Sequence, residues 1–457
     1  MLKFRLFNKL IIIVAVLCLP AVTVVASTTL PAGETIWQGK VVVDKSIRIP
    51  SGSKLVIKKG TVVRITTPAA QIDVAGILQI AGTVAKPVVF DSAQGWLGIS
   101  FVEAGKGSSI VGARFSKAET VVSSIATDFA VTDSSFVDCG TAIKLLRESS
   151  PLIENNHFEK NDMAIDNEMR SAPTIRHNKF IGHQKTAILA SHNSRGLIAD
   201  NSFEQNEQGI GLLQTYPDKV LNNTFIENKL AIYCNQTKST PIIEGNRFER
   251  NEIALVNYSF AYPSVVENRF IDNKMAIRND QYGSPQVKNN LFSGNGTAIH
   301  NYRKSNPVVE NNIIKKSELA MFCDYSSYPT VRNNHFSANK MAVELGIYQS
   351  ADWEKRSGSK ALMQKEALAR NSKNSMLSQA PTKFNDRVDV SGNWWDKNTP
   401  VMVAAAPGAN LPFFHDRLDK EWVTYEGFGP ESYRIDLIVY RPWLDQPVAK
   451  VGPRKAK

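Results

Sequence analysis

Between residues 110 and 345 the chain repeats one pattern of apolar and polar positions about every 22 residues. Each unit holds two or three short apolar runs separated by polar bends, and no unit has room for a helix of about ten residues. Such units predict a solenoid in which equal positions of successive units stack on one another. The column that defines the repeat is Phe115, Phe136, Phe158, Phe180, Phe203, Phe225, Phe248, Phe270, Phe292, Ile314 and Phe336.

Asparagine occurs on both sides of this apolar column. The first asparagine column, two positions before it, is Asn156, Asn178, Asn201, Asn223, Asn246, Asn268, Asn290, Asn312 and Asn334. The second, three positions after most members, is Asn161, Asn206, Asn228, Asn251, Asn273, Asn295 and Asn339. Stacked amides can donate to the next coil on one side and accept from the coil on the other, and asparagine tolerates the left-handed backbone of a tight corner. We therefore interpret both columns as structural.

The pattern divides the chain into a solenoid and its ends. Residues 51–345 are the predicted repeats, and residues 27–50, with Trp37, are the predicted N-terminal cap. Residues 346–383 form an insertion, of which 359–378 lack β-branched side chains and predict a helix. Val390, Asn393 and Trp395 repeat the core spacing, so residues 384–457 are expected to form a final coil and a C-terminal cap. The predicted fold is an all-β parallel β-helix of roughly 12–15 coils.

Residues 1–26 have the composition of a signal peptide. Lys3, Arg5 and Lys9 precede an apolar run that ends at Leu19, and Ala26 closes a small-residue cleavage site. We expect export to the periplasm, the cell surface or the medium. The run is short for a membrane span of about 20 residues, and no later segment is apolar enough to cross a bilayer. A retained N-terminal anchor is the alternative to cleavage.

Net charge limits the classes of binding partner, and cysteine positions limit the disulfides that can form. Removing the three basic residues of the leader takes the net charge from +11 to +8, which suits acidic polymers or anionic surfaces. Export and the lack of a nucleic-acid-binding motif argue against nucleic acid. Cys139, Cys234 and Cys323 occupy distant repeat positions, and Cys234 and Cys323 lie four coils apart, so we predict no disulfide framework.

One outward face carries the most varied chemistry. Strand alternation after the closing aliphatic residue points Asn167, Cys234, Asn257, Asn279, Asn301 and Cys323 inward. It points one column, Tyr233, Arg278, His300 and Phe322, and a second column, Asn235, Tyr258, Asp280, Tyr302 and Asp324, outward. Aromatic rings stack on sugars, and the charged groups pair with hydroxyls or uronates, so these nine residues are the candidate ligand-binding site. The alternative is that the rings stack on their own neighbours and stabilise the sheet.

Residues 110–345 resemble the right-handed parallel β-helix repeats of NosD-like periplasmic proteins and of carbohydrate-binding and sugar-hydrolase β-helix domains. The opening is also similar, with Gly60-Thr61 and Gly82-Thr83 spaced 22 residues apart, and so is the ending at Asn393-Trp394-Trp395. The resemblance implies a right-handed β-helix. It does not imply one activity, because members include lyases, hydrolases, epimerases and adhesins.

Catalysis would need two positioned carboxyl groups, and the candidates are Asp280 and Asp324. They lie two coils apart, about 9.6 Å between backbones at the strand spacing, near the upper end of the inverting range of about 6.5–9.5 Å. The aspartate clusters of related hydrolases and the calcium-binding acidic cluster of related lyases are not recognisable here. The histidines are scattered, so we expect no metal site and no cofactor, with calcium only under the lyase alternative.

These observations favour an exported, non-catalytic β-helix that binds polysaccharide or organises a cell-envelope glycan. A polysaccharide lyase or glycoside hydrolase acting on an acidic glycan is the enzyme alternative. A structural or adhesive spacer, or a NosD-like periplasmic accessory protein, is the third hypothesis.

Overall fold

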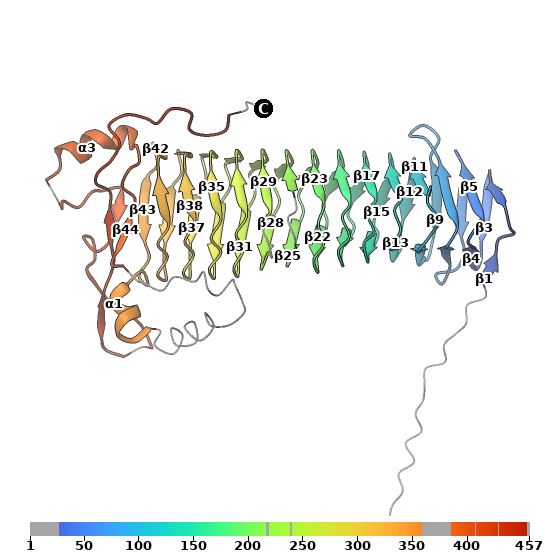
Figure 1. Cartoon of the computed structure of the whole chain (residues 1–457), viewed down its shortest axis with the longest axis horizontal. Helices are drawn as coiled ribbons and strands as arrows, with labels where there is room; N and C mark the ends of the chain where they lie inside the picture. Colours follow the sequence, from blue (N-terminus) through green and yellow to red (C-terminus); the bar gives the residue numbers. More distant parts are fainter. Residues whose placement is uncertain are drawn as a thin grey trace, which may run out of the picture.

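The chain forms one long parallel β-helix, drawn from a computed structural model in Figure 1. The structure describes residues 27–454 except 216–218, 238–239, 359–384, 407 and 428. The predicted signal peptide and the predicted helix at 359–378 therefore lie outside the described residues. Each coil passes through three parallel sheets, A, B and C, in turn, and within the described residues sheets B and C hold 14 strands each. The predicted all-β parallel β-helix is confirmed.

Sheet A comprises β1 (Ser27–Thr29), β4 (Ser46–Ile49), β7 (Gln71–Val74), β10 (Gly98–Val102), β13 (Thr120–Ile125), β16 (Thr141–Leu146), β19 (Met163–Asn167), β22 (Thr186–Ser191), β25 (Gln208–Leu213), β28 (Leu230–Asn235), β31 (Ile253–Tyr258), β34 (Met275–Asp280), β37 (Thr297–Asn301), β40 (Leu319–Cys323), β43 (Met341–Leu345) and β45 (Phe414–His415).

Sheet B comprises β2 (Glu34–Trp37), β5 (Lys54–Lys58), β8 (Ile77–Ala81), β11 (Ser109–Val111), β14 (Ala130–Thr132), β17 (Leu152–Glu154), β20 (Thr174–Arg176), β23 (Leu197–Ala199), β26 (Lys219–Leu221), β29 (Ile242–Glu244), β32 (Ser264–Val266), β35 (Gln286–Lys288), β38 (Val308–Glu310) and β41 (Thr330–Arg332).

Sheet C comprises β3 (Lys40–Val43), β6 (Val62–Ile65), β9 (Val88–Ser92), β12 (Ala113–Ser116), β15 (Ser135–Val137), β18 (His157–Glu159), β21 (Lys179–Ile181), β24 (Ser202–Glu204), β27 (Thr224–Ile226), β30 (Arg247–Glu249), β33 (Arg269–Ile271), β36 (Leu291–Ser293), β39 (Ile313–Lys315) and β42 (His335–Ser337).

The phenylalanine column lies on the inner face of sheet C. Phe225 pairs in register with Phe248, and Phe248 with Phe270. The rings are buried and stack with centroids 4.9 Å and 4.7 Å apart for these two pairs. That separation is close to the spacing between neighbouring strands, about 4.8 Å, so each ring rests flat on the ring of the next coil.

The first asparagine column forms a continuous ladder at the corner between sheets B and C, called here the B–C corner. Asn246 Nδ2 donates to Asn268 Oδ1 at 3.0 Å, and Asn268 Nδ2 donates to Asn290 Oδ1 at 3.1 Å. The same amides bond to main-chain groups; for example, Asn268 Oδ1 accepts from the backbone N–H of Asn246. Side-chain amides thereby pair buried corner groups that the three sheets leave unpaired.

Two more ladders lie inside the solenoid. The second predicted column stacks at the corner between sheets C and A, where Asn228 Nδ2 donates to Asn251 Oδ1 at 3.0 Å. In sheet A, Asn257 donates to Asn279 and Asn279 to Asn301, each at 2.9 Å. The inward positions predicted for sheet A are confirmed by burial of all six residues: Asn167, Cys234, Asn257, Asn279, Asn301 and Cys323. No disulfide joins the three described cysteines to one another.

The expected backbone role of the ladder asparagines is wrong. The left-handed residue at each corner is the one before the ladder asparagine, as with Glu267 (φ 57) before Asn268 and Arg250 (φ 53) before Asn251. The reason is that the ladder side chain must point inward, whereas the left-handed residue sits at the apex with its side chain outside. The apex positions are therefore occupied by many residue types.

The ends differ from each other. Residues 27–50, where we predicted a cap, form β1–β4, which pair in parallel with the following coil and so extend the sheets. At the other end Asn393 continues the amide ladder, accepting from Asn334 Nδ2 at 2.9 Å, and Trp395 stacks on Phe336 at 4.5 Å. Both residues therefore extend the columns of the preceding coils.

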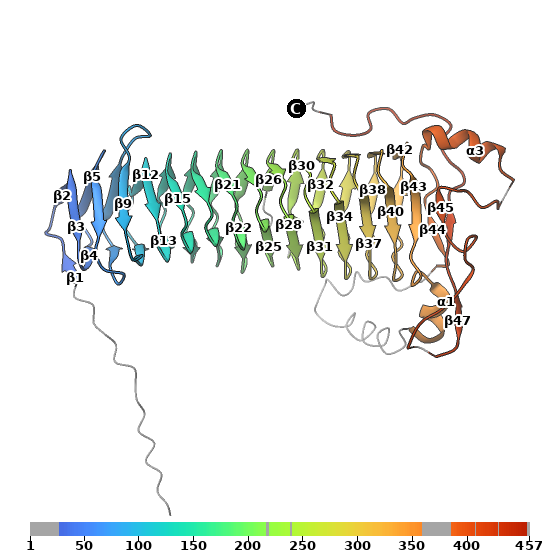
Figure 2. The same cartoon turned by 180° about the vertical axis from the view of Figure 1, so that it is seen from behind.

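The C-terminal elements close the last coil and then turn back (Figures 1 and 2). They include α1 (Ala351–Trp353), η1 (Glu354–Gly358), β44 (Arg387–Asp389), η3 (Asp396–Asn398), α3 (Thr399–Ala404), β46 (Trp422–Thr424), β47 (Ser432–Arg434) and β48 (Leu437–Val439). β44 pairs in parallel with β48, and β46 pairs antiparallel with β47. The last described residues run back along the solenoid on the side opposite α1.

Replacing Asn268 with Ala should lower the free energy of unfolding by about 3 kcal/mol, because it strips partners from the buried amides of Asn246 and Asn290. Urea unfolding followed by circular dichroism measures the change. Asn410→Ala, at an exposed asparagine of the C-terminal region, is the matched control and should cost less than about 0.5 kcal/mol. Equal losses for the two variants would contradict the stabilising role of the ladder.

Candidate ligand-binding face

The outer face of sheet A gathers all nine residues predicted as ligand-binding. In the first column Arg278 pairs in register with His300 and His300 with Phe322, and Tyr233 lies two coils before Arg278. In the second column Asn235 is in register with Tyr258, and Tyr258 with Asp280. Tyr302 and Asp324 extend it, since their backbone N–H groups bond to Asn279 and Asn301 of the preceding coils. We call these two columns the sheet A face.

The rings of this face also pack on one another. Tyr233 lies 6.3 Å from Tyr258 between ring centroids, and His300 stacks on Phe322 at 4.8 Å. Tyr302 meets Tyr325 at the corner between sheets A and B, and Tyr325 stacks on Tyr348 at 4.3 Å. The rings are half-buried rather than fully exposed. Stacking between neighbours, the alternative interpretation of these residues, is therefore a part of their role.

Asp280 is buried between two guanidinium groups. Arg278 Nη2 lies 3.0 Å from Asp280 Oδ2, while Arg303 donates from Nε to Oδ1 at 2.6 Å and from Nη2 to Oδ2 at 2.8 Å. Only 2% of the Asp280 side chain is exposed, against 40% for Arg278 and 42% for Arg303. The charge presented to solvent is therefore positive, although the anchor is a carboxylate.

Arg303 does not belong to the columns predicted from the sequence. It follows Tyr302 at the left-handed corner, φ 48, from which its side chain returns over the sheet A face. Its guanidinium carbon lies 5.2 Å from the centroid of the Tyr302 ring. The alternation of inward and outward positions did not predict Arg303, because this residue lies beyond the end of the strand. Only the geometry of the corner places its side chain over the sheet A face.

Asp324 lies in a different environment from Asp280. It is buried, and Oδ1 accepts the backbone N–H of Tyr325 at 2.9 Å. Loss of hydration on burial raises the pKa of its carboxyl to about 6. The next coil contributes Gly346, where a Cβ atom would come within 2.3 Å of Asp324 Cγ, so the pocket for this carboxyl depends on a glycine.

His300 is neutral at physiological pH. Burial, with the positive charge of Arg278 as a second cause, lowers its pKa to about 4. Its Nδ1 atom is buried and has no hydrogen-bond partner within the described part of the chain. The imidazole ring therefore acts as an aromatic surface in the column rather than as a cation.

A second charged cluster lies on the same sheet toward the N-terminus. Lys144 Nζ is 3.0 Å from Asp166 and 3.7 Å from Glu168, and His192 Nδ1 is 3.6 Å from Glu168. Burial raises the pKa of Asp166. Lys144 and Asp166 occupy the column of Arg278, three to four coils before Tyr233. Extending the alternation to these earlier coils would have found them in the sequence.

The described part of the insertion borders the sheet A face. Ser326 donates to Glu354 of η1 at 2.9 Å, and Lys304 lies 3.8 Å from the same carboxylate.

Across the described ranges, no group of three or more His, Cys, Asp or Glu side chains could hold a metal ion. No helix in those ranges is long and apolar enough to cross a bilayer.

The family that matches the sequence agrees with the architecture. The sequence profile described as a right handed beta helix region matches residues 98–216, 122–284 and 264–352, which together span more than half of the chain. No curated protein matches the sequence. Among solved structures, an alginate lyase from Paenibacillus sp. str. FPU-7 is similar at 11% identity, covering 67% of this chain and 98% of that chain, with a TM-score of 0.18.

The raised pKa of Asp324 makes a pH-dependent contribution to stability. The pKa of this carboxyl rises from about 4 in the unfolded chain to about 6 in the folded chain. The folded state therefore binds the proton more tightly, and the free energy of unfolding decreases as the pH rises from 4 through 6. Asp324→Asn cannot ionise, so its stability relative to the native chain should increase by up to about 3 kcal/mol between pH 4 and pH 7. Urea unfolding of both proteins at the two pH values measures the difference. A difference that does not change with pH would contradict the assignment.

Proposed function

Because the chain belongs to the right-handed β-helix family, we propose that it is an exported scaffold that binds an acidic polysaccharide along the sheet A face without cleaving it. The observation that carries the proposal is the arrangement of Arg278, Asp280 and Arg303 beside aromatic rings. The buried carboxylate holds both guanidinium groups in place and neutralises one of them, which leaves one net positive charge at the surface.

The chemistry of this group suits a polymer of uronate sugars. A guanidinium presents N–H donors in a fixed plane and forms paired hydrogen bonds with carboxylates. Tyr302, under Arg303, and Tyr258, one coil away from Asp280, provide apolar ring surface beside the charges. Aromatic rings recur along the same face at Tyr233, His300 and Phe322, so a long polymer lying along the solenoid axis would meet several rings beside the charged group.

The environments of the two aspartates support binding rather than cleavage. Both oxygens of Asp280 are engaged by arginine, so it has no oxygen free to act as a base toward a substrate. Asp324 is buried and bonded to the chain's own backbone. Inverting hydrolysis needs two carboxyl groups that face the scissile bond together.

Replacing Tyr258, Tyr302 and Phe322 with Ala should weaken binding of polygalacturonate or alginate by at least about tenfold, since each lost stacking surface contributes roughly 0.5–1.5 kcal/mol. Affinity electrophoresis in gels containing the polymer measures the change. Trp422→Ala, at an exposed aromatic of the C-terminal region, is the control and should bind as the native chain does.

The same experiment separates binding from catalysis. The polymer recovered from the native protein should keep its original length and should gain no unsaturated sugar ends, which a lyase would create and which ultraviolet absorbance detects. Retention of full affinity in the triple variant would contradict the proposed face. Shortened polymer, lost in Asp280→Asn or Asp324→Asn, would contradict the non-catalytic role.

A further inference from the structure

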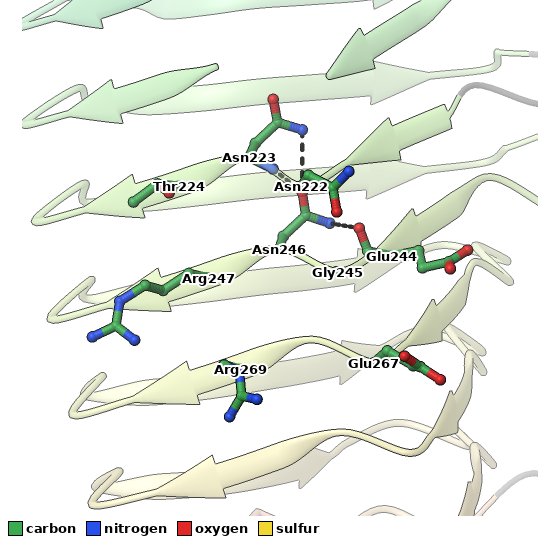
Figure 3. Close-up of a pocket in the computed structure, with 9 residues that line it drawn as sticks. All are labelled: Asn222, Asn223, Thr224, Glu244, Gly245, Asn246, Arg247, Glu267 and Arg269. Atoms are coloured by element: carbon green, nitrogen blue, oxygen red, sulfur yellow. Dashed lines mark hydrogen bonds between the residues drawn. The ribbon is translucent and has the colours of Figure 1, made fainter. Parts of the chain in front are cut away.

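A pocket of about 280 Å³ opens at the B–C corner, on the outside of the solenoid and away from the sheet A face (Figure 3). Its central feature is Gly245, which occupies the left-handed apex position with φ +67. The apex residues of neighbouring coils, Asn222 and Glu267, carry side chains. The missing side chain of Gly245 leaves the gap between them, and a Cβ atom there would lie 2.6 Å from Asn222 Oδ1.

The two sides of this pocket carry side chains of opposite charge. Glu244 and Glu267 stand on the sheet B side, and Arg247 and Arg269 stand on the sheet C side, as Figure 3 shows. Arg247 is neutralised by Glu249, with Nε 2.8 Å from Oε2. Glu244 is exposed and forms no side-chain hydrogen bond or ion pair with any described residue. The sheet B side therefore offers negative charge to a ligand.

The chain's own last described residues follow the same corner toward the pocket. Gly452 is buried and donates its backbone N–H to the carbonyl oxygen of Asn311, an apex residue, at 2.9 Å. Two coils further along, Arg454 Nε lies 3.6 Å from Glu267 Oε1. An extended polypeptide with a basic side chain thus already lies on the B–C corner, and its guanidinium contacts one wall of the pocket.

We propose that the Gly245 pocket is a binding site for the lysine or arginine side chain of an extended segment of a partner polypeptide, held by Glu244 and Glu267. The partner segment lies at the B–C corner beside residues 452–454, with Gly245 providing space for its side chain. Arg454 competes for Glu267 and thereby limits the affinity of the site. This site is separate from the sheet A face, so the two proposals stand or fall independently.

The probe for this site is a fluorescein-labelled peptide Val-Gly-Pro-Arg-Lys-Ala-Lys, which has the sequence of residues 451–457. Fluorescence anisotropy with the full chain should show saturable binding. Glu244→Gln should weaken it by about tenfold, because a charge-assisted hydrogen bond is lost. Arg454→Ala should strengthen it, because Glu267 is released.

Two further variants make the test specific. Gly245→Asn fills the pocket with the residue that other apex positions, such as Asn289 and Asn311, already hold in the left-handed conformation, so it should fold normally and lose binding. Glu154→Gln is the matched control, since Glu154 is in the same column as Glu244, four coils away, and pairs with Arg176 at 2.8 Å.

Each outcome decides the proposal. Loss of binding in Gly245→Asn and Glu244→Gln, with unchanged binding in Glu154→Gln and unchanged unfolding midpoints, supports it. No saturable binding to the full chain or to Arg454→Ala overturns it. Equal weakening by Glu154→Gln and Glu244→Gln also overturns it, because the peptide is then held by general negative charge. Undiminished binding in Gly245→Asn shows that the pocket is not the site.

Discussion

The structure depends on satisfying buried polar groups at the corners of a very narrow coil. Three short strands per turn leave backbone N–H and C=O groups at each bend that cannot join the sheets, and leaving one unpaired inside a protein costs about 1–3 kcal/mol. The asparagine ladders meet this requirement by bonding sideways, from one coil to the next, as Asn246, Asn268 and Asn290 do. Because each amide needs an equivalent partner in both neighbouring coils, the 22-residue repeat is maintained.

The same requirement separates the inside of the solenoid from the outside. Inward positions are restricted to rings, aliphatic side chains and ladder amides, whereas apex and outward positions can change freely from coil to coil. Chemical variety is therefore concentrated at outward positions. The sheet A face departs from the repeat through Arg278 and Asp280, and the B–C corner departs from it at Gly245, where an apex side chain is missing.

Burial gives similar residues different properties on this outer surface. Asp280 and Asp324 lie two coils apart in one column, yet Asp280 is held between two arginines and Asp324 has a carboxyl whose pKa is raised to about 6 by burial. The parallel stack places them in equivalent backbone positions. The following coil sets their environments, because Arg303 pairs with Asp280 whereas Gly346 leaves room for the Asp324 carboxyl.

The sequence by itself determined the fold, because a period of 22 residues leaves only stacked short strands as a way to bury the phenylalanine and asparagine columns. It also determined the inward and outward positions of sheet A, since alternation in a strand is strict. It misplaced the left-handed residue by one position, because asparagine suits both a ladder and a left-handed bend. Only the tertiary structure showed the contacts of Arg303 with Asp280, of Glu354 with Ser326 and of Arg454 with Glu267. Those contacts join corners, an insertion and a tail to the stack, and no repeat period relates such segments to one another.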